Sequence, residues 1–129
     1  MRTEQVSPQG IAEQLHEHRI LEVDGRLVKL DAEGYLVDPA QWSAAVTSMM
    51  AEQDGLELDD DHWLLIDFLH RFYAEYSVAP DLPILARNLC KDQKDCRWTR
   101  KYIKSLFPLG ARSACRYAGL PAPVGRSCG

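Results

Sequence analysis

The sequence has no long apolar segment. No apolar run approaches the roughly 18 residues that a helix needs to cross a bilayer, so we expect no membrane insertion. The first residues, Met1 to Gln5, are not followed by the apolar core of an export signal, so a cytoplasmic location is expected. The 129 residues show no internal repeat, and 46% of them are hydrophobic. These values predict a single globular domain that buries a core of its own.

The C-terminal third has no glutamate. Residues 87–129 hold 10 Lys and Arg, 2 Asp and no Glu, whereas residues 1–86 hold 5 Lys and Arg and 17 Asp and Glu. One interpretation is that the two parts neutralise each other within one fold. The other is that a basic surface surrounds the C-terminal thiols. Cations there would lower a cysteine pKa and would attract an anionic substrate or an acidic partner.

The cysteines and histidines do not have the spacing of a zinc site. Five residues separate Cys90 from Cys96, where a zinc half-site has two to four, and no second pair completes them. We therefore expect no metal, with Cys90 packed against the apolar face of its helix and Cys96 in a polar loop. We expect His62, at the start of a helix, to support or cap that helix rather than to form a catalytic Cys-His dyad.

Turn and capping residues predict an α+β fold that is mainly helical. Two short alternating runs around Asp24-Gly25 predict a β-hairpin over residues 20–30. Asp38 with Pro39 predicts one helix start, and the acidic run 59–61 predicts another. The expected helices cover residues 11–18, 39–55, 59–79, 82–90, 97–106 and 111–118. The expected architecture is a small helical bundle with an N-terminal β-hairpin, divided into a leader (1–19), one domain (20–119) and a mobile C-terminal arm (120–129).

The segment from Arg97 to Lys104 interleaves basic and aromatic residues. Such a helix can follow a phosphate backbone, so nucleic-acid binding is an alternative function. We favour an amphipathic helix, with Trp98, Tyr102 and Ile103 near the core and the charges in solvent, because the chain has a formal net charge of −4.

A cysteine stands one residue before the C-terminus. Cys128 ends a tail rich in glycine and proline, and Cys115 lies thirteen positions upstream on an expected short helix. The tail can swing outward or fold back to bring the two sulfur atoms within disulfide distance. The pattern predicts thiolate attack on sulfur through a persulfide or a mixed disulfide. Arg112, Arg116 and Arg126 are candidates to stabilise a thiolate. The plainer alternative is a tolerated terminal cysteine and a buried apolar one.

Several segments together resemble the DsrC/TusE sulfur-relay family. They are Asp31–Leu36, Gln41-Trp42, His62-Trp63, Phe72-Tyr73, Tyr102–Gly110, Ala114–Pro123 and the penultimate cysteine. The resemblance covers about residues 20–129. It implies a sulfur carrier that takes a sulfane sulfur from an upstream relay protein onto Cys128. It implies no cofactor, and it makes the protein a co-substrate of other enzymes rather than a complete enzyme.

The resemblance includes two branches, which differ in their cysteines. Both Cys115 and Cys128 are present, which is DsrC-like and implies dissimilatory sulfite reductase as the partner and Cys115 as the bridging or resolving thiol. This is the main expectation. The alternatives are TusE-like transfer toward 2-thiouridine in tRNA, and a redox-switched regulatory or binding paralogue. The two cysteines are usually eleven positions apart in the family, so the arm is two residues longer here, through an insertion around Arg126-Ser127.

Overall fold

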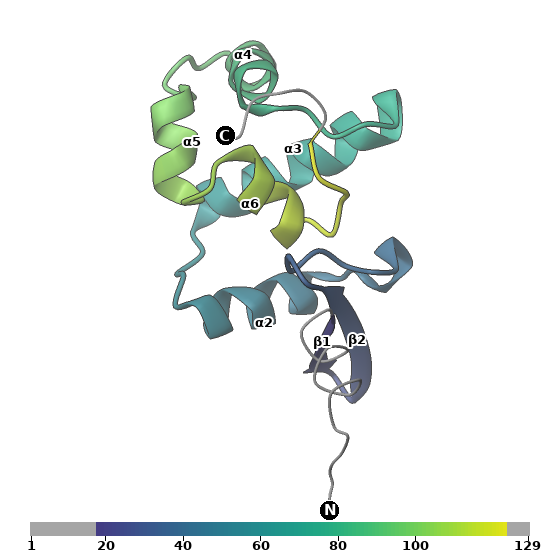
Figure 1. Ribbon diagram of the computed structural model, residues 1–129. Helices are drawn as coiled ribbons and strands as arrows, with labels where there is room; N and C mark the ends of the chain where they lie inside the picture. Colours follow the sequence, from purple (N-terminus) through teal and green to yellow (C-terminus); the bar gives the residue numbers. More distant parts are fainter. Residues whose placement is uncertain (1–17, 124–129) are drawn as a thin grey trace, which may run out of the picture.

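The computed structural model describes residues 18–123, which form a helical bundle with a β-hairpin at one end (Figure 1). The expected fold class is confirmed. None of the described helices is long and apolar enough to span a membrane. The elements are β1 (His18–Val23), β2 (Arg26–Asp31), the 3-10 helix η1 (Pro39–Gln41), α2 (Ala44–Asp54), α3 (Asp60–Tyr76), α4 (Leu82–Gln93), α5 (Arg100–Leu106) and α6 (Ala111–Tyr117).

The hairpin forms around the expected turn. Asp24 and Gly25 have φ of 52° and 79°, and a type I′ turn needs positive φ at both positions. The strands are antiparallel, and alternate side chains on them are buried: Leu21, Val23, Val28 and Leu30. This face packs against α2. The helix expected over residues 11–18 lies outside the described residues except for His18, which begins β1.

The single helix expected over residues 39–55 is two elements. Asp38 caps only η1, where its carboxylate accepts a hydrogen bond from the Ala40 N–H at 3.0 Å. Trp42 is then extended, with φ −66° and ψ 142°, and Ser43 caps a new helix, α2. The expected boundary was wrong because Trp42 leaves the helical path, which places its indole against the end of α6.

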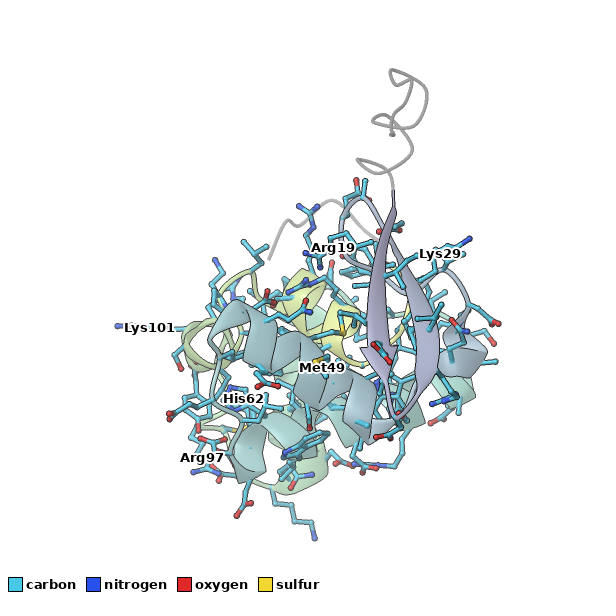
Figure 2. The ribbon with its side chains drawn as sticks, turned by 90° about the horizontal axis from the view of Figure 1, so that it is seen from below. Arg19, Lys29, Met49, His62, Arg97 and Lys101 are labelled. Carbon is cyan, nitrogen blue, oxygen red and sulfur yellow. A yellow bond between two sulfur atoms is a disulfide. The ribbon has the colours of Figure 1, made fainter. Side chains whose placement is uncertain are left out.

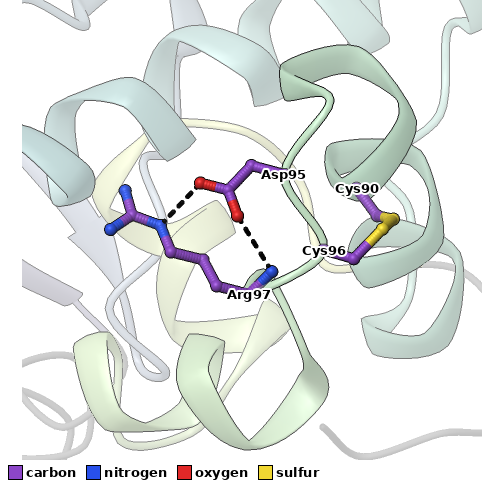
Figure 3. The surroundings of a disulfide bond; sticks show 4 residues. All are labelled: Cys90, Asp95, Cys96 and Arg97. Atoms are coloured by element: carbon purple, nitrogen blue, oxygen red, sulfur yellow. Dashed lines mark hydrogen bonds and ion pairs between the residues drawn. A yellow bond between two sulfur atoms is a disulfide. The ribbon is translucent and has the colours of Figure 1, made fainter.

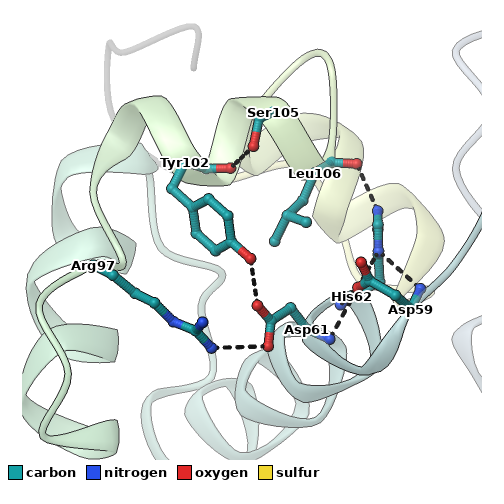
Figure 4. Close-up of polar contacts among 7 residues, drawn as sticks. All are labelled: Asp59, Asp61, His62, Arg97, Tyr102, Ser105 and Leu106. Carbon is teal, nitrogen blue, oxygen red and sulfur yellow. Dashed lines mark hydrogen bonds and ion pairs between the residues drawn. The ribbon is translucent and has the colours of Figure 1, made fainter.

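His62 joins the start of α3 to the end of α5 (Figure 4). The Asp59 carboxylate accepts a hydrogen bond from the His62 N–H, and His62 Nδ1 accepts one from the Asp59 N–H, both at 3.1 Å. This reciprocal pair is a capping box. His62 Nε2 donates to the Leu106 carbonyl at 2.8 Å. The capping and structural role expected for this buried histidine is therefore confirmed.

The basic and aromatic segment is an amphipathic surface element, as we expected. Trp98 and Ile103 are buried, and the half-buried Tyr102 donates its hydroxyl hydrogen to Asp61. Figure 2 shows Lys101 pointing away from the bundle. The helix begins at Arg100 rather than at residue 97, because Thr99 caps it.

The acidic and basic parts of the chain pair with each other. Arg97 contacts Asp61 at 3.2 Å, and Arg116 contacts Asp54 at 2.7 Å. Each pair joins the basic C-terminal third to the acidic remainder. Among the described residues, ion pairs within the fold therefore neutralise part of the opposite charges of the two regions.

The expectation that Cys90 is only a packing residue was wrong. α4 continues three residues past its expected end, and Cys90 forms a disulfide with Cys96. The reason is a reversal of the chain at Lys94, whose φ is 52°, which turns the loop back along the helix. Cys96 is exposed in this loop, as we expected.

Two glycines with the same backbone conformation allow a matched stability test. Gly55 has φ 73° with open space around it, whereas Gly119 has φ 74° and an added Cβ would lie 2.5 Å from Trp42 Cδ1. We expect Gly55→Ala to lower the free energy of unfolding by about 1 kcal/mol, from left-handed strain alone. Gly119→Ala adds overlap with the indole, so about 2–4 kcal/mol is expected. Urea unfolding measures both. Equal losses would contradict the packing of Trp42 on Gly119.

Candidate functional site

α6 places Cys115 in the centre of the molecule. The helix packs against both α2 and α3 (Figure 1), and Cys115 is 0% exposed. Burial raises the pKa of the Cys115 thiol to about 12. The thiol is therefore protonated at neutral pH. We predicted from the sequence that nearby cations would stabilise a thiolate. For Cys115 this prediction is wrong, because burial away from solvent governs its pKa.

Side chains from other elements bind the backbone at the end of α6. The Tyr117 carbonyl accepts hydrogen bonds from Thr47 Oγ1 at 2.6 Å and from Trp42 Nε1 at 3.0 Å. His70 Nε2 donates to the Ala118 carbonyl at 2.8 Å. The last carbonyls of a helix have no partner within the helix. Here α2, α3 and Trp42, which lies two residues before α2, supply the partners.

The chain then leaves α6 through a tight, hydrogen-bonded turn. The Leu120 N–H donates to the Cys115 carbonyl at 3.0 Å, and the Gly119 N–H donates to the Arg116 carbonyl at 3.1 Å. The positive φ of Gly119 permits this helix end. We call residues 117–120 the arm root. Because the arm root bonds to the backbone of Cys115 itself, the thiol and the start of the C-terminal segment are held as one unit.

α6 also lines a surface groove of about 550 Å³. The groove contains two arginines, two carboxylates and an exposed leucine. Tyr35 donates its hydroxyl hydrogen to the Arg112 carbonyl at 3.4 Å, which attaches the turn after β2 to α6. Burial raises the pKa of Tyr35, so its hydroxyl keeps the proton that it donates. The lining residues are Glu33, Tyr35, Asp54, Leu109, Arg112, Ser113 and Arg116.

Arg116 is used within this surface rather than at the thiol. Its guanidinium donates to Asp54 at 2.7 Å and lies 4.8 Å from the centre of the Tyr117 ring. Tyr117 also donates to Asp54, at 2.6 Å. Partial burial opposes ionisation of Asp54, but the two hydrogen bonds outweigh it and hold the pKa of this carboxyl below its ordinary value.

The structure describes only part of the site that the sequence predicted. Cys115, Arg112 and Arg116 lie on α6, with Arg112 exposed. Cys128 and Arg126 lie outside the described residues. Within residues 18–123, no group of three or more His, Cys, Asp and Glu side chains is arranged to hold a metal ion.

The residues that hold the arm root were missed from the sequence. Trp42 was expected within the helix over residues 39–55 and as part of the family resemblance, and neither Thr47 nor His70 was given a role. The one available signal was the position of Thr47 on α2, three and four residues before the buried Met50 and Ala51. A threonine on the apolar face of a helix needs a partner for its hydroxyl group.

The family model described as "DsrC like protein" matches residues 22–128, which takes in the penultimate cysteine. Sulfurtransferase TusE of Pectobacterium atrosepticum is 37% identical over 106 residues, covering 81% of this chain and 97% of that protein. Sulfurtransferase TusE of Yersinia pestis is 36% identical with the same coverage. The fold and these matches define a small protein of the sulfur-relay class.

Solved structures with a similar fold support the same assignment. The NMR structure of Allochromatium vinosum DsrC is 42% identical, with a TM-score of 0.78, over 85% of this chain and 99% of that chain. The crystal structure of the oxidized gamma-subunit of the dissimilatory sulfite reductase (DsrC) from Archaeoglobus fulgidus is 35% identical, with a TM-score of 0.74, over 84% and 100%. The chain belongs to the DsrC-like family.

The burial of Cys115 predicts a thiol that does not react in the folded protein. At about pH 8 a pKa of about 12 leaves almost no thiolate, and only the thiolate is nucleophilic. We expect iodoacetamide to leave Cys115 unmodified in the native state and to label it in urea, as peptide mass spectrometry would report. Rapid native labelling would contradict the sealed position.

The same shift gives the stability a pH dependence. The folded pKa of Cys115 lies above the unfolded value of about 8.5, so the folded state retains a proton that the unfolded state loses between these values. The free energy of unfolding should therefore fall as pH rises from about 9 toward 12. A Cys115→Ala variant, compared with the parent chain in urea titrations across this range, should show a smaller fall.

Proposed function

We propose that this protein is a sulfur carrier that receives a sulfane sulfur on Cys128 and passes it to an acceptor protein. In the proposed step the Cys128 thiolate attacks the outer sulfur of a donor persulfide, and the donor leaves as its own thiolate. Cys128 then bears the persulfide, and no external oxidant or reductant is needed. The observation that carries the proposal is the family match through residue 128, which includes the penultimate cysteine.

The state of the other cysteines supports this choice of sulfur acceptor. Cys115 is fully buried, and burial raises the pKa of its thiol to about 12. Cys90 and Cys96 are joined to each other. A donor persulfide would therefore meet no free, accessible thiol among the described residues, which leaves Cys128 for loading.

The destination we favour is TusE-type sulfur transfer rather than the sulfite-reductase-linked role that the sequence analysis preferred. The curated relatives named above are both Sulfurtransferase TusE, and this chain covers 97% of each of them. By this proposal the sulfur goes toward 2-thiouridine in tRNA through a further acceptor protein. Loss of 2-thiouridine from cellular tRNA on deletion of the gene, with restoration by the parent chain and not by Cys128→Ser, would support this destination. Unchanged 2-thiouridine would contradict it.

A second candidate function is favoured by Cys115. This cysteine is the feature that the resemblance associates with DsrC-like partners of dissimilatory sulfite reductase, and the solved structures at 42% and 35% identity are named DsrC. In that case Cys115 and Cys128 would be bridged by sulfur at the end of a cycle. The sealed Cys115 would then have to be uncovered, either by release of the arm root or by a partner.

The carrier proposal is tested by loading the full chain with inorganic polysulfide. We expect intact-mass spectrometry to show a gain of one sulfur atom on the parent chain and on Cys115→Ala, and none on Cys128→Ser. Circular dichroism checks that each variant is folded. An unchanged sulfur adduct on Cys128→Ser would overturn the proposal. Loss of a Cys115–Cys128 bridged species in Cys115→Ala, with loading intact, would support the second candidate.

A further inference from the structure

The Cys90–Cys96 disulfide lies outside the site described above. It joins the last turn of α4 to the α4–α5 loop, across six positions of sequence, with Cα atoms 4.3 Å apart (Figure 3). Neither cysteine belongs to α6 or to the arm root. The proposed sulfur transfer does not use this pair, so its presence needs a separate explanation.

Hydrogen bonds fix the loop without help from the sulfur bond. The Asp95 N–H donates to the Cys90 carbonyl at 3.1 Å, which returns the chain along the helix end. The Asp95 carboxylate then accepts from the Arg97 N–H and from Arg97 Nε, both at 3.1 Å (Figure 3). Arg97 in turn contacts Asp61 on α3 at 3.2 Å. Two thiols at positions 90 and 96 would therefore stay adjacent after reduction.

This arrangement argues against a simple structural staple. A disulfide stabilises a fold mainly by closing a long loop in the unfolded chain, and the effect falls as the loop shortens. Here the sequence separation is only six, and the loop already has its own hydrogen bonds. Preorganised neighbouring thiols instead allow the bond to form again after each reduction, because their effective concentration is high.

The two sulfur atoms differ in access. Cys96 lies in an exposed loop position, whereas Cys90 is half-buried on α4. Thiol–disulfide exchange begins at the sulfur that the incoming thiolate can reach. The geometry therefore makes Cys96 the sulfur that is attacked and Cys90 the leaving thiolate.

We propose that Cys90 and Cys96 form a second, independent redox site that exchanges electrons with thiol reductants. One thiolate attacks Cys96, the Cys90–Cys96 bond breaks, and Cys90 leaves as a thiolate. A second thiolate attacks the reductant's sulfur in this mixed disulfide and releases Cys96, so that two thiols become one disulfide. The protein gains two electrons and, after protonation, two thiols. The reverse reaction uses an oxidised disulfide of the same class.

The test uses the full chain with Cys128→Ser, repeated in Cys128→Ser/Cys115→Ala. Each protein is equilibrated in mixtures of reduced and oxidised glutathione, quenched with N-ethylmaleimide and weighed by mass spectrometry. We expect Cys90 and Cys96 to carry either no maleimide or two. The fraction that carries two should depend only on the ratio of reduced to oxidised glutathione, whether the protein starts reduced or oxidised. Far-UV circular dichroism should be unchanged by reduction. A pair that stays closed in every mixture, stays open in every mixture, or opens only on unfolding would overturn the proposal.

Single variants test the direction of attack. Cys90→Ser should leave Cys96 to form a mixed disulfide with oxidised glutathione, and Cys96→Ser should leave Cys90 to do so several-fold more slowly. Equal or reversed rates would overturn the assignment of Cys96. Thioredoxin is a second probe of the same pair. Reduction by both glutathione and thioredoxin supports a site open to thiol reductants in general, and reduction by neither overturns the proposal.

A matched pair of carboxylate variants tests whether the loop holds the thiols together. Asp95→Ala removes the contacts to Arg97, so the disulfide should be reduced at a lower ratio of reduced to oxidised glutathione. Asp92→Ala removes the same charge nearby but breaks only contacts with Arg71 and Gln93. The glutathione ratio at which half of its disulfide is reduced should therefore equal that of the parent chain. Equal midpoints for all three chains would show that the loop does not preorganise the pair, which would overturn this part of the proposal.

Discussion

Two backbone carbonyls at the end of α6 organise this protein. The carbonyls of Tyr117 and Ala118 accept hydrogen bonds from Thr47 on α2, from Trp42 two residues before α2, and from His70 on α3. A buried carbonyl without a partner costs about 1–3 kcal/mol, so these side chains make the helix end compatible with burial. They also fix where α6 stops, how deeply Cys115 lies and where the chain leaves the core.

The four cysteines show how position decides the chemistry of one residue type. Cys115 is enclosed on all sides and remains a thiol over a wide pH range. Cys96 lies in solvent and is bonded to the half-buried Cys90. In the proposed function only the cysteine next to the C-terminus is available for loading. Among the described residues, the fold thus separates a buried free thiol from a disulfide-bonded pair at the surface.

Local signals in the sequence were sufficient for most of the architecture. Asp24-Gly25 specified the hairpin turn and Asp59 specified the start of α3, because each acts through its immediate neighbours. The helix expected from Asp38 failed because Trp42 binds a carbonyl 75 positions away. No local pattern encodes such a contact, and a strong helix start does not reveal that the helix will stop after one turn.

The site was predictable in its residue types but not in its environments. Cys115 was correctly placed on the last helix, yet its basic neighbours suggested a reactive thiolate where burial gives the opposite. Arg116 is engaged by Asp54, whose position depends on the packing of α2 against α6. The Cys90–Cys96 bond depends on a left-handed residue at Lys94, a position that lysine seldom favours and that sequence reasoning therefore did not expect.

A fixed arm root has a geometric consequence for the proposed transfer. Leu120 donates a hydrogen bond to the backbone of Cys115, which fixes the start of the eight residues that lead to Cys128 in the sequence. Fully extended, they reach roughly 26–29 Å. An acceptor atom must come within that radius when its protein docks on the domain. The two additional residues that the resemblance implies before Cys128 would lengthen the radius by roughly 7 Å. Distance from the arm root, rather than thiol reactivity, would then decide which docked protein receives the sulfur.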